Sequence, residues 1–174
     1  MIGATGAAAL LLSIGLLCAR WIDTAVWLCA LQAALAAILL GEVSAAFALL
    51  AFALNGVALP VAIARMSSRA PLTLRGNALV SWAGATVLLL AAVAGMTKAG
   101  TGGMVAAGTS VALLGLLLVA VRSHALAPAL GLLSSQNGLV LVAGAHPGVS
   151  LPTALAVTVP LVPALVLADH WLRR

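Results

Sequence analysis

The chain has 174 residues, of which 64% are hydrophobic and 6% are charged, and its net charge is +5. A soluble domain carries roughly a quarter charged residues, so this composition excludes an ordinary soluble protein and indicates a single integral membrane domain over residues 1–174. The positive charge lies between apolar runs, which is typical of loops on one side of a membrane and does not indicate nucleic-acid binding.

A helix needs roughly twenty apolar residues to cross a hydrocarbon core about 30 Å thick. Runs of this kind recur along the chain and predict an all-α, polytopic bundle of about seven transmembrane helices. The predicted spans are residues 2–19, 24–40, 43–64, 78–95, 104–121, 125–145 and 151–168. The first run lacks a basic start and a small-residue cleavage site, so we interpret it as a retained helix.

Two of the spans contain helix-breaking residues. The third holds Asn55-Gly56 and then Pro60, which predicts a kink. The seventh holds Pro160 and Pro163, which remove two backbone donors, so we expect it to be bent and shielded by its neighbours. Between the second and third spans there is almost no connecting sequence, which predicts an antiparallel hairpin.

The basic residues predict the orientation of the helices. With the N-terminus outside, the cytoplasmic loops and tail hold Arg20, Arg65, Arg69, Arg75, Arg122, Arg173 and Arg174, and the other side holds only Lys98. This asymmetry predicts an N-out, C-in topology. Trp21 and Trp27 suit an aromatic belt at the membrane surface.

Ionisable residues are missing from the predicted membrane interior. All eleven Lys, Arg, Asp and Glu residues fall at or near predicted helix ends, whereas proton pumps and ion-coupled transporters need ionisable groups inside the bilayer. Glu42 is the one candidate acid near a span, and its place at a tight turn favours a solvated side chain. Asp23, Glu42 or Asp169 deep in a hydrated channel would contradict this interpretation.

No motif indicates enzyme chemistry. Cys18 and Cys29 fit no CxxC or zinc spacing, and we interpret them as two buried thiols. The three histidines are scattered near predicted helix ends, and the glycine-rich stretch at 100–103 lacks the Lys and Ser/Thr of a phosphate-binding loop. We therefore predict no catalytic residue, no cofactor and no metal site.

Neutral polar residues do occur inside the predicted spans. The stretch from Pro128 to Ser150 has membrane-crossing length and is interrupted by a run of Ser134, Ser135, Gln136, Asn137 and Gly138. Amides are costly in lipid, so we expect this run to face other protein. The candidate polar positions within the membrane are Gln32, Asn55, Gln136 and Asn137. They are interpreted as hydrogen-bonding groups between helices, with a file of water molecules as the alternative.

Two segments resemble a known family. The residues LGLLSSQNGLVLVAGAHPG, from Leu130 to Gly148, resemble the stretch LGxLxxENGxxLxxxxxPG of membrane component E of hydrogenase-4 and formate hydrogenlyase complexes. Upstream, Leu31-Gln32, the residues LNGVALP at 54–60 and Arg65 resemble the family's LQ…LxKxxxIPxxxR pattern. That family is related to the K subunit of respiratory complex I and to the C subunit of multisubunit cation/proton antiporters.

The resemblance implies that ionisable groups of the family have been replaced. The family's glutamate before Asn-Gly corresponds to Gln136, a second glutamate to Ala154, an acidic residue to the neighbourhood of Pro160, and a lysine to Asn55. The implied protein is a non-catalytic structural subunit of a complex I-like assembly, of the group 4 hydrogenase or formate hydrogenlyase type, in a bacterial-type inner (cytoplasmic) membrane. Its implied partners are antiporter-like and other membrane subunits and the lipid bilayer.

Two alternatives remain open from the residues alone. Gln32, Asn55 and Gln136 could line a water wire for lateral proton transfer between antiporter-like subunits. The second alternative is a stand-alone small membrane transporter, although no ion-pairing residue falls within the predicted membrane interior.

Overall fold

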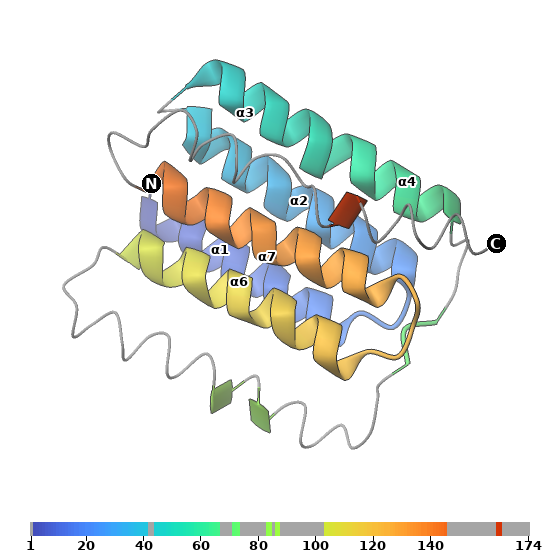
Figure 1. Ribbon diagram of the computed structural model, residues 1–174. Coiled ribbons are helices and arrows are strands. Elements are labelled where there is room, and N and C mark those ends of the chain that lie inside the picture. The colour runs from blue at the N-terminus through green and yellow to red at the C-terminus, as the bar shows by residue number, and fades with distance from the viewer. Residues whose placement is uncertain are drawn as a thin grey trace.

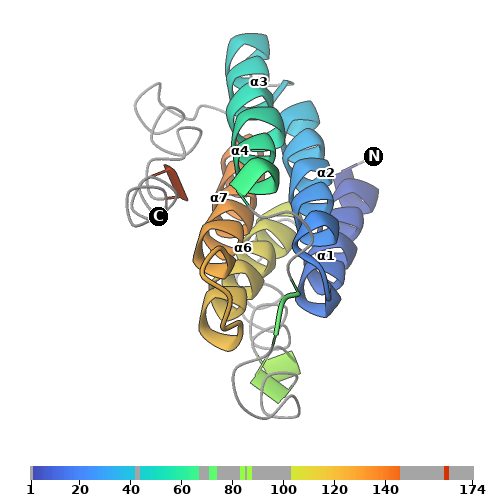
Figure 2. The same cartoon turned by 90° about the vertical axis from the view of Figure 1, so that its right-hand side faces the viewer.

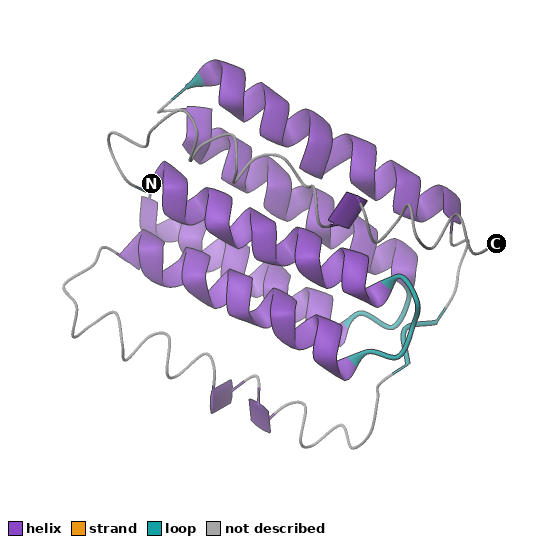
Figure 3. Cartoon of the chain, viewed as in Figure 1, coloured by secondary structure: helices purple, strands orange, loops and turns teal. Residues whose placement is uncertain are grey.

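The computed structural model describes residues 2–41, 44–66, 71–73, 83–84, 86–87, 103–145 and 163–164. Its long helices lie side by side along a common direction (Figures 1 and 2). An isolated bridge pairs Trp21 with Pro71. The described part of the chain otherwise contains no β-structure, so it is all-α, as predicted (Figure 3).

Five predicted spans are confirmed as helices to within a few residues. The helices are α1 (Ile2–Cys18), α2 (Ile22–Gly41), a continuous helix made of α3 (Ala45–Ala51), η1 (Phe52–Ala58) and α4 (Leu59–Met66), then α6 (Gly103–Val121) and α7 (Ala127–Gly144). Glu42 and Asp169 lie outside the described residues. So do the predicted spans 78–95 and 151–168, apart from short helical pieces at 83–84, 86–87 and 163–164.

Four of these helices form a ring. α1 packs against α2, α2 against α7, α7 against α6, and α6 against α1. The continuous helix from α3 to α4 packs along α2 on the outside of this ring (Figure 2). The chain reverses direction between α2 and α3, which confirms the predicted antiparallel hairpin (Figure 1).

Three described helices are long and apolar enough to cross a membrane: Ile22–Gly41, Ala45–Met66 and Gly103–Val121. α7 has 18 residues, but its polar centre lowers its hydropathy, and 13 of those residues are buried. α7 is therefore shielded by protein, as its polar residues require, because amides in contact with lipid would lack hydrogen-bond partners.

The break predicted in the third span is a π-helix, η1, which contains Asn55 and Gly56. At its end the Leu59 N–H donates to the Leu54 carbonyl, five residues back. Such wider turns inside α-helices are rare and occur often at functional sites. η1 ends at Ala58, two residues before Pro60. In a regular α-helix the ring of a proline clashes with the carbonyl group four residues before it. The wider turn therefore relieves the steric clash at Pro60, on which the predicted kink was based.

Glycines bring α6 and α7 into backbone contact. Gly108 and Gly115 of α6 lie opposite Gly138 and Gly131 of α7, and the spacing within each helix is seven residues. A Cβ added at Gly115 would lie 2.5 Å from the Ser135 nitrogen and 2.6 Å from the Gly131 carbonyl oxygen. Small residues allow this close approach of helices in membrane proteins.

The described basic residues gather at one end of the bundle, which we call the arginine end. Arg20 follows α1, Arg65 lies in the last turn of α4, and Arg122 follows α6. The ends of α1 and α6 are close together, as the hydrogen bond from the Arg122 side chain to the Leu17 carbonyl oxygen shows. This clustering agrees with the arginine asymmetry seen in the sequence.

Candidate functional site

A chain of hydrogen bonds crosses the middle of the four-helix ring. Ser134 Oγ on α7 donates to Gln32 Oε1 on α2 over 3.0 Å, and Gln32 Nε2 donates to Ser13 Oγ on α1 over 2.6 Å. Ser13 Oγ in turn donates to the Ala9 carbonyl oxygen over 2.9 Å. All three polar side chains are buried. One amide therefore joins three helices near the centre of the bundle.

α7 makes further polar contacts with both of its neighbours. Asn137 Nδ2 donates to the Cys29 carbonyl oxygen of α2 over 3.3 Å, and Cys29 Sγ lies 3.7 Å from the Leu130 carbonyl oxygen. On the other side, Ser135 Oγ donates to the Ala112 carbonyl oxygen of α6 over 2.8 Å. These contacts confirm that the polar run of α7 faces protein.

The structure places all four candidate polar positions inside the bundle. Gln32, Asn55, Gln136 and Asn137 are buried. Gln32 and Asn137 both lie at the contact between α2 and α7, whereas Asn55 lies in η1, on the helix that packs along α2. Ala154 and Pro160 lie outside the described residues.

The direction of these hydrogen bonds limits what this polar layer can do. A serine hydroxyl has one proton, and Ser134 and Ser13 donate theirs to Gln32 and to a backbone carbonyl respectively. The amide of Gln32 does not titrate. Among these described groups the chain of donors ends at the backbone of α1, so the arrangement links α7, α2 and α1 to one another.

Arg122 is the buried charged residue of the described part of the chain, with 6% of its surface exposed. Its Nη1 donates to the Leu72 carbonyl oxygen over 2.6 Å, and its Nη2 donates to the Leu17 carbonyl oxygen. Leu17 is in the last turn of α1, where a cation interacts favourably with the unpaired carbonyl groups of the helix end. Burial lowers the pKa of the Arg122 guanidinium from its ordinary value.

The backbone of residues 71–73 completes this contact. The Leu72 N–H donates to the Arg20 carbonyl oxygen over 2.7 Å, and the Ser123 N–H donates to the Thr73 carbonyl oxygen over 3.2 Å. The segment thus connects the ends of α1 and α6. From the sequence, Arg122 was predicted only to lie in a basic loop, because no local pattern shows that a distant segment covers it.

The structure corrects one prediction about the cysteines and places one of the histidines. Cys29 is buried, as predicted, but Cys18, the last residue of α1, is exposed, so the prediction of two buried thiols was wrong for Cys18. His124 accepts a hydrogen bond at Nδ1 from the Leu126 N–H at the start of α7. Within the described ranges, no group of three or more His, Cys, Asp or Glu side chains could hold a metal ion.

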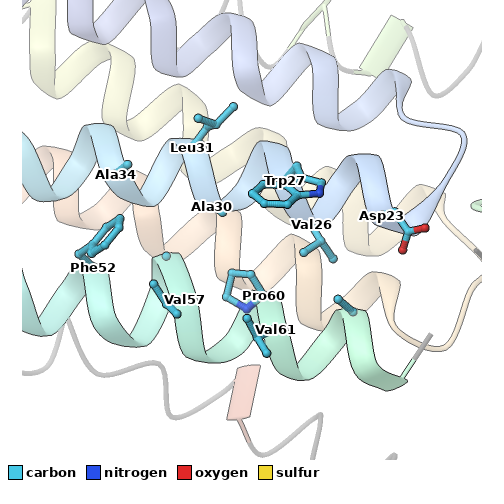
Figure 4. Close-up of a pocket in the computed structure, with 12 residues that line it drawn as sticks. Asp23, Val26, Trp27, Ala30, Leu31, Ala34, Phe52, Val57, Pro60 and Val61 are labelled. Atoms are coloured by element: carbon cyan, nitrogen blue, oxygen red, sulfur yellow. The ribbon is translucent and has the colours of Figure 1, made fainter. Parts of the chain in front are cut away.

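An apolar groove runs along the outer surface of the bundle, between α2 and the helix formed by η1 and α4 (Figure 4). Its volume is about 510 Å³. Asp23 lies at one end and Phe52 at the other, and Trp27 and Pro60 lie on opposite walls. We call this feature the α2–α4 groove.

Long apolar helices around a shielded polar helix define this chain as a helical membrane-embedded protein. No protein-family model, curated protein or solved structure matches it. The resemblance to component E therefore remains a prediction that depends on the two sequence segments.

Proposed function

We propose that this chain is a non-catalytic structural membrane subunit of a complex I-like redox or ion-translocating assembly, of the group 4 hydrogenase or formate hydrogenlyase type. The observation that supports it best is the hydrogen-bonded chain from Ser134 through Gln32 to Ser13. A conducting subunit would place titratable groups here. This bundle instead uses an amide and two hydroxyls, whose protons are already donated.

The topology of the proposed subunit is about seven spans with the N-terminus outside and the C-terminus in the cytoplasm. Support comes from the arginine end, where Arg20, Arg65 and Arg122 gather. Cytoplasmic loops carry an excess of Lys and Arg, so we assign the arginine end to the cytoplasmic side of an inner membrane.

The connections between described helices support a structural role. Residues 19–21 join α1 to α2, and residues 122–126 join α6 to α7. Connections of this length cannot fold into a catalytic domain outside the membrane. In this proposal the reaction belongs to other subunits, and we propose antiporter-like membrane subunits as the partners.

Native electrophoresis tests the proposal. An epitope-tagged chain, extracted from its own membrane with a mild detergent, should migrate in a large complex together with other membrane subunits. Extraction with a denaturing detergent is the control, because it should release the tagged chain as a separate species of about 17.2 kDa. Migration at that small size after mild extraction would contradict a structural subunit.

A substitution at Gln136, which is buried on α7, distinguishes the water-wire alternative from this proposal. For a structural subunit, Gln136→Leu should leave the proton translocation of each assembled complex unchanged. If Gln136 helps to hold a water wire, the same variant should assemble normally and translocate fewer protons. The measurement is acidification by vesicles, normalised to the amount of assembled complex on a native gel.

A further inference from the structure

We propose that the α2–α4 groove binds a phospholipid that has a primary-amine headgroup. One acyl chain lies in the groove, and the ammonium group of the lipid contacts Asp23. The groove is formed by this chain alone, so lipid binding there does not depend on membership of a larger complex.

The length of the groove matches one leaflet of a bilayer. Along α2 its lining runs from Asp23 to Ala34. At about 1.5 Å per residue this is roughly 16 Å, which is about half of a hydrocarbon core of about 30 Å. An acyl chain that starts at Asp23 would therefore follow the groove to the middle of the membrane. The volume also falls within the range of about 300–1,000 Å³ that is usual for ligand pockets.

A second hollow begins where the groove ends. It lies between α2 and α3, and it shares Ala34 and Phe52 with the α2–α4 groove. The Phe52 side chain is 42% exposed and stands at the junction of the two hollows. A partner transmembrane helix needs a continuous surface across the whole bilayer. Two hollows that meet at an aromatic side chain instead fit acyl chains from opposite leaflets.

The lining of the groove suits a hydrocarbon chain. Val57, Val61 and Leu31 line it and are all partly exposed. Trp27, with 72% of its surface exposed, lies one helical turn from Asp23. Tryptophan is enriched at the level of lipid headgroups, so its position agrees with a headgroup near Asp23.

The charges at the mouth of the groove are complementary to a zwitterion. Asp23 is partly buried, and among the described residues its carboxylate has no ion pair or hydrogen bond. Arg20 precedes Asp23 by three residues, and Arg65 follows Ala64, which lines the groove. Both arginines are exposed. An ammonium group can pair with Asp23 while the adjacent phosphate pairs with one of the arginines.

These charges distinguish between headgroups. A primary ammonium donates charge-assisted hydrogen bonds to a carboxylate, whereas a choline group has no N–H to donate. A glycerol headgroup brings only the negative phosphate, which suits the arginines but leaves Asp23 without a cation. The groove should therefore prefer phosphatidylethanolamine over phosphatidylcholine and phosphatidylglycerol.

Competition between lipids tests the proposal. The purified full chain is reconstituted with equal amounts of the three phospholipids, and native mass spectrometry measures the ratio of the lipids that stay bound. We expect phosphatidylethanolamine to be enriched about five-fold, the ratio that a favourable, partly exposed ion pair supplies. Because the ratio is measured within one sample, it does not depend on the yield of folded protein.

Substitutions at Asp23 test the headgroup contact. Asp23→Asn should reduce the preference for phosphatidylethanolamine to about one-fold, because the amide has no charge, and Asp23→Glu should retain it. An acidic residue in the first turn of α2 also stabilises that helix, but this stabilisation does not change the lipid ratio. A preference that survives Asp23→Asn would overturn the proposal.

Substitutions along α2 and α1 test the groove itself. Ala30→Phe places a ring in the groove and should lower the total amount of bound lipid (Figure 4). The matched control is Ala8→Phe, which lies in a neighbouring hollow between α1 and α2 and does not line the groove, so it should not change the preference for phosphatidylethanolamine. Equal binding of all three lipids by the unsubstituted chain, or a preference for phosphatidylglycerol, would also overturn the proposal.

Discussion

At the scale of single residues, the buried polar groups differ in how many helices they join. Gln32 connects α1 and α7 to α2, whereas Thr109 donates to the Val105 carbonyl oxygen within its own helix. Hydrogen bonds between membrane helices contribute about 0.6 kcal/mol on average and up to about 1.7 kcal/mol. The contribution of a polar residue to stability should therefore follow the number of helices that it joins.

This difference predicts the effect of removing each group. Gln32→Leu should lower the free energy of unfolding by about 1–2 kcal/mol, because it removes two hydrogen bonds and leaves the Ser134 hydroxyl buried without its acceptor. Thr109→Val is the control and should have a small effect. Thermal unfolding in mild detergent measures both. Equal losses for the two variants would show that Gln32 does not connect the helices.

Arg122 allows a second comparison at this scale. Arg122→Ala removes a buried cation from two backbone carbonyl groups and should lower the free energy of unfolding by about 2 kcal/mol or more. Arg65→Ala removes an exposed arginine from the same end of the bundle and should change it by less than about 0.5 kcal/mol. Thermal unfolding measures both variants, and similar losses would contradict the role assigned to Arg122.

At the scale of helices, the contact between α6 and α7 depends on the absence of side chains. Gly108, Gly115, Gly131 and Gly138 let the two backbones meet, and the Ser135–Ala112 hydrogen bond lies within this contact. A single methyl group at Gly115 would overlap backbone atoms, which cannot move aside as a side chain can. The position of α7, and with it the polar layer, therefore depends on these glycines.

Alanine substitutions test this dependence. Gly115→Ala should lower the free energy of unfolding by about 1–3 kcal/mol, because the two helices must separate to admit the methyl group. Gly103→Ala is the matched control, since a Cβ there meets no atom within 4 Å. Alanine also has a higher helix propensity than glycine, so the control substitution should be neutral or slightly stabilising. A loss of stability at Gly103 equal to that at Gly115 would argue against close packing as the cause.

At the scale of the whole molecule, the arginine end predicts how the bundle lies in a membrane. Arg20, Arg65 and Arg122 share that end, and α1 ends there with the exposed Cys18. Positive charge is retained on the cytoplasmic side, so Cys18 should lie on that side. Cys29 lies inside the bundle and serves as an internal control.

Cysteine labelling checks this orientation. A maleimide that does not cross membranes should label Cys18 in inside-out vesicles and leave it unlabelled in intact cells. Cys18→Ser should abolish the label in inside-out vesicles, and Cys29 should react only after denaturation. Labelling of Cys18 in intact cells would reverse the proposed orientation.

Local composition was enough to locate the described helices and to predict the burial of the polar run. The hydrocarbon core needs long apolar segments, and this requirement located α1, α2, the α3–α4 helix, α6 and α7 to within a few residues. Because amides need hydrogen-bond partners, Gln136 and Asn137 were predicted to face protein, and both are buried. Both conclusions follow from local composition, because the bilayer imposes the same conditions on each segment.

Which side chains meet could be seen only in the folded bundle. The sequence did not pair Gln32 with Ser13 and Ser134, or bring residues 71–73 over Arg122. It also did not show that Cys18 faces outward, or that a π-helix precedes Pro60. These features depend on how the helices are rotated and on how closely they pack, and contacts between residues distant in the sequence set both.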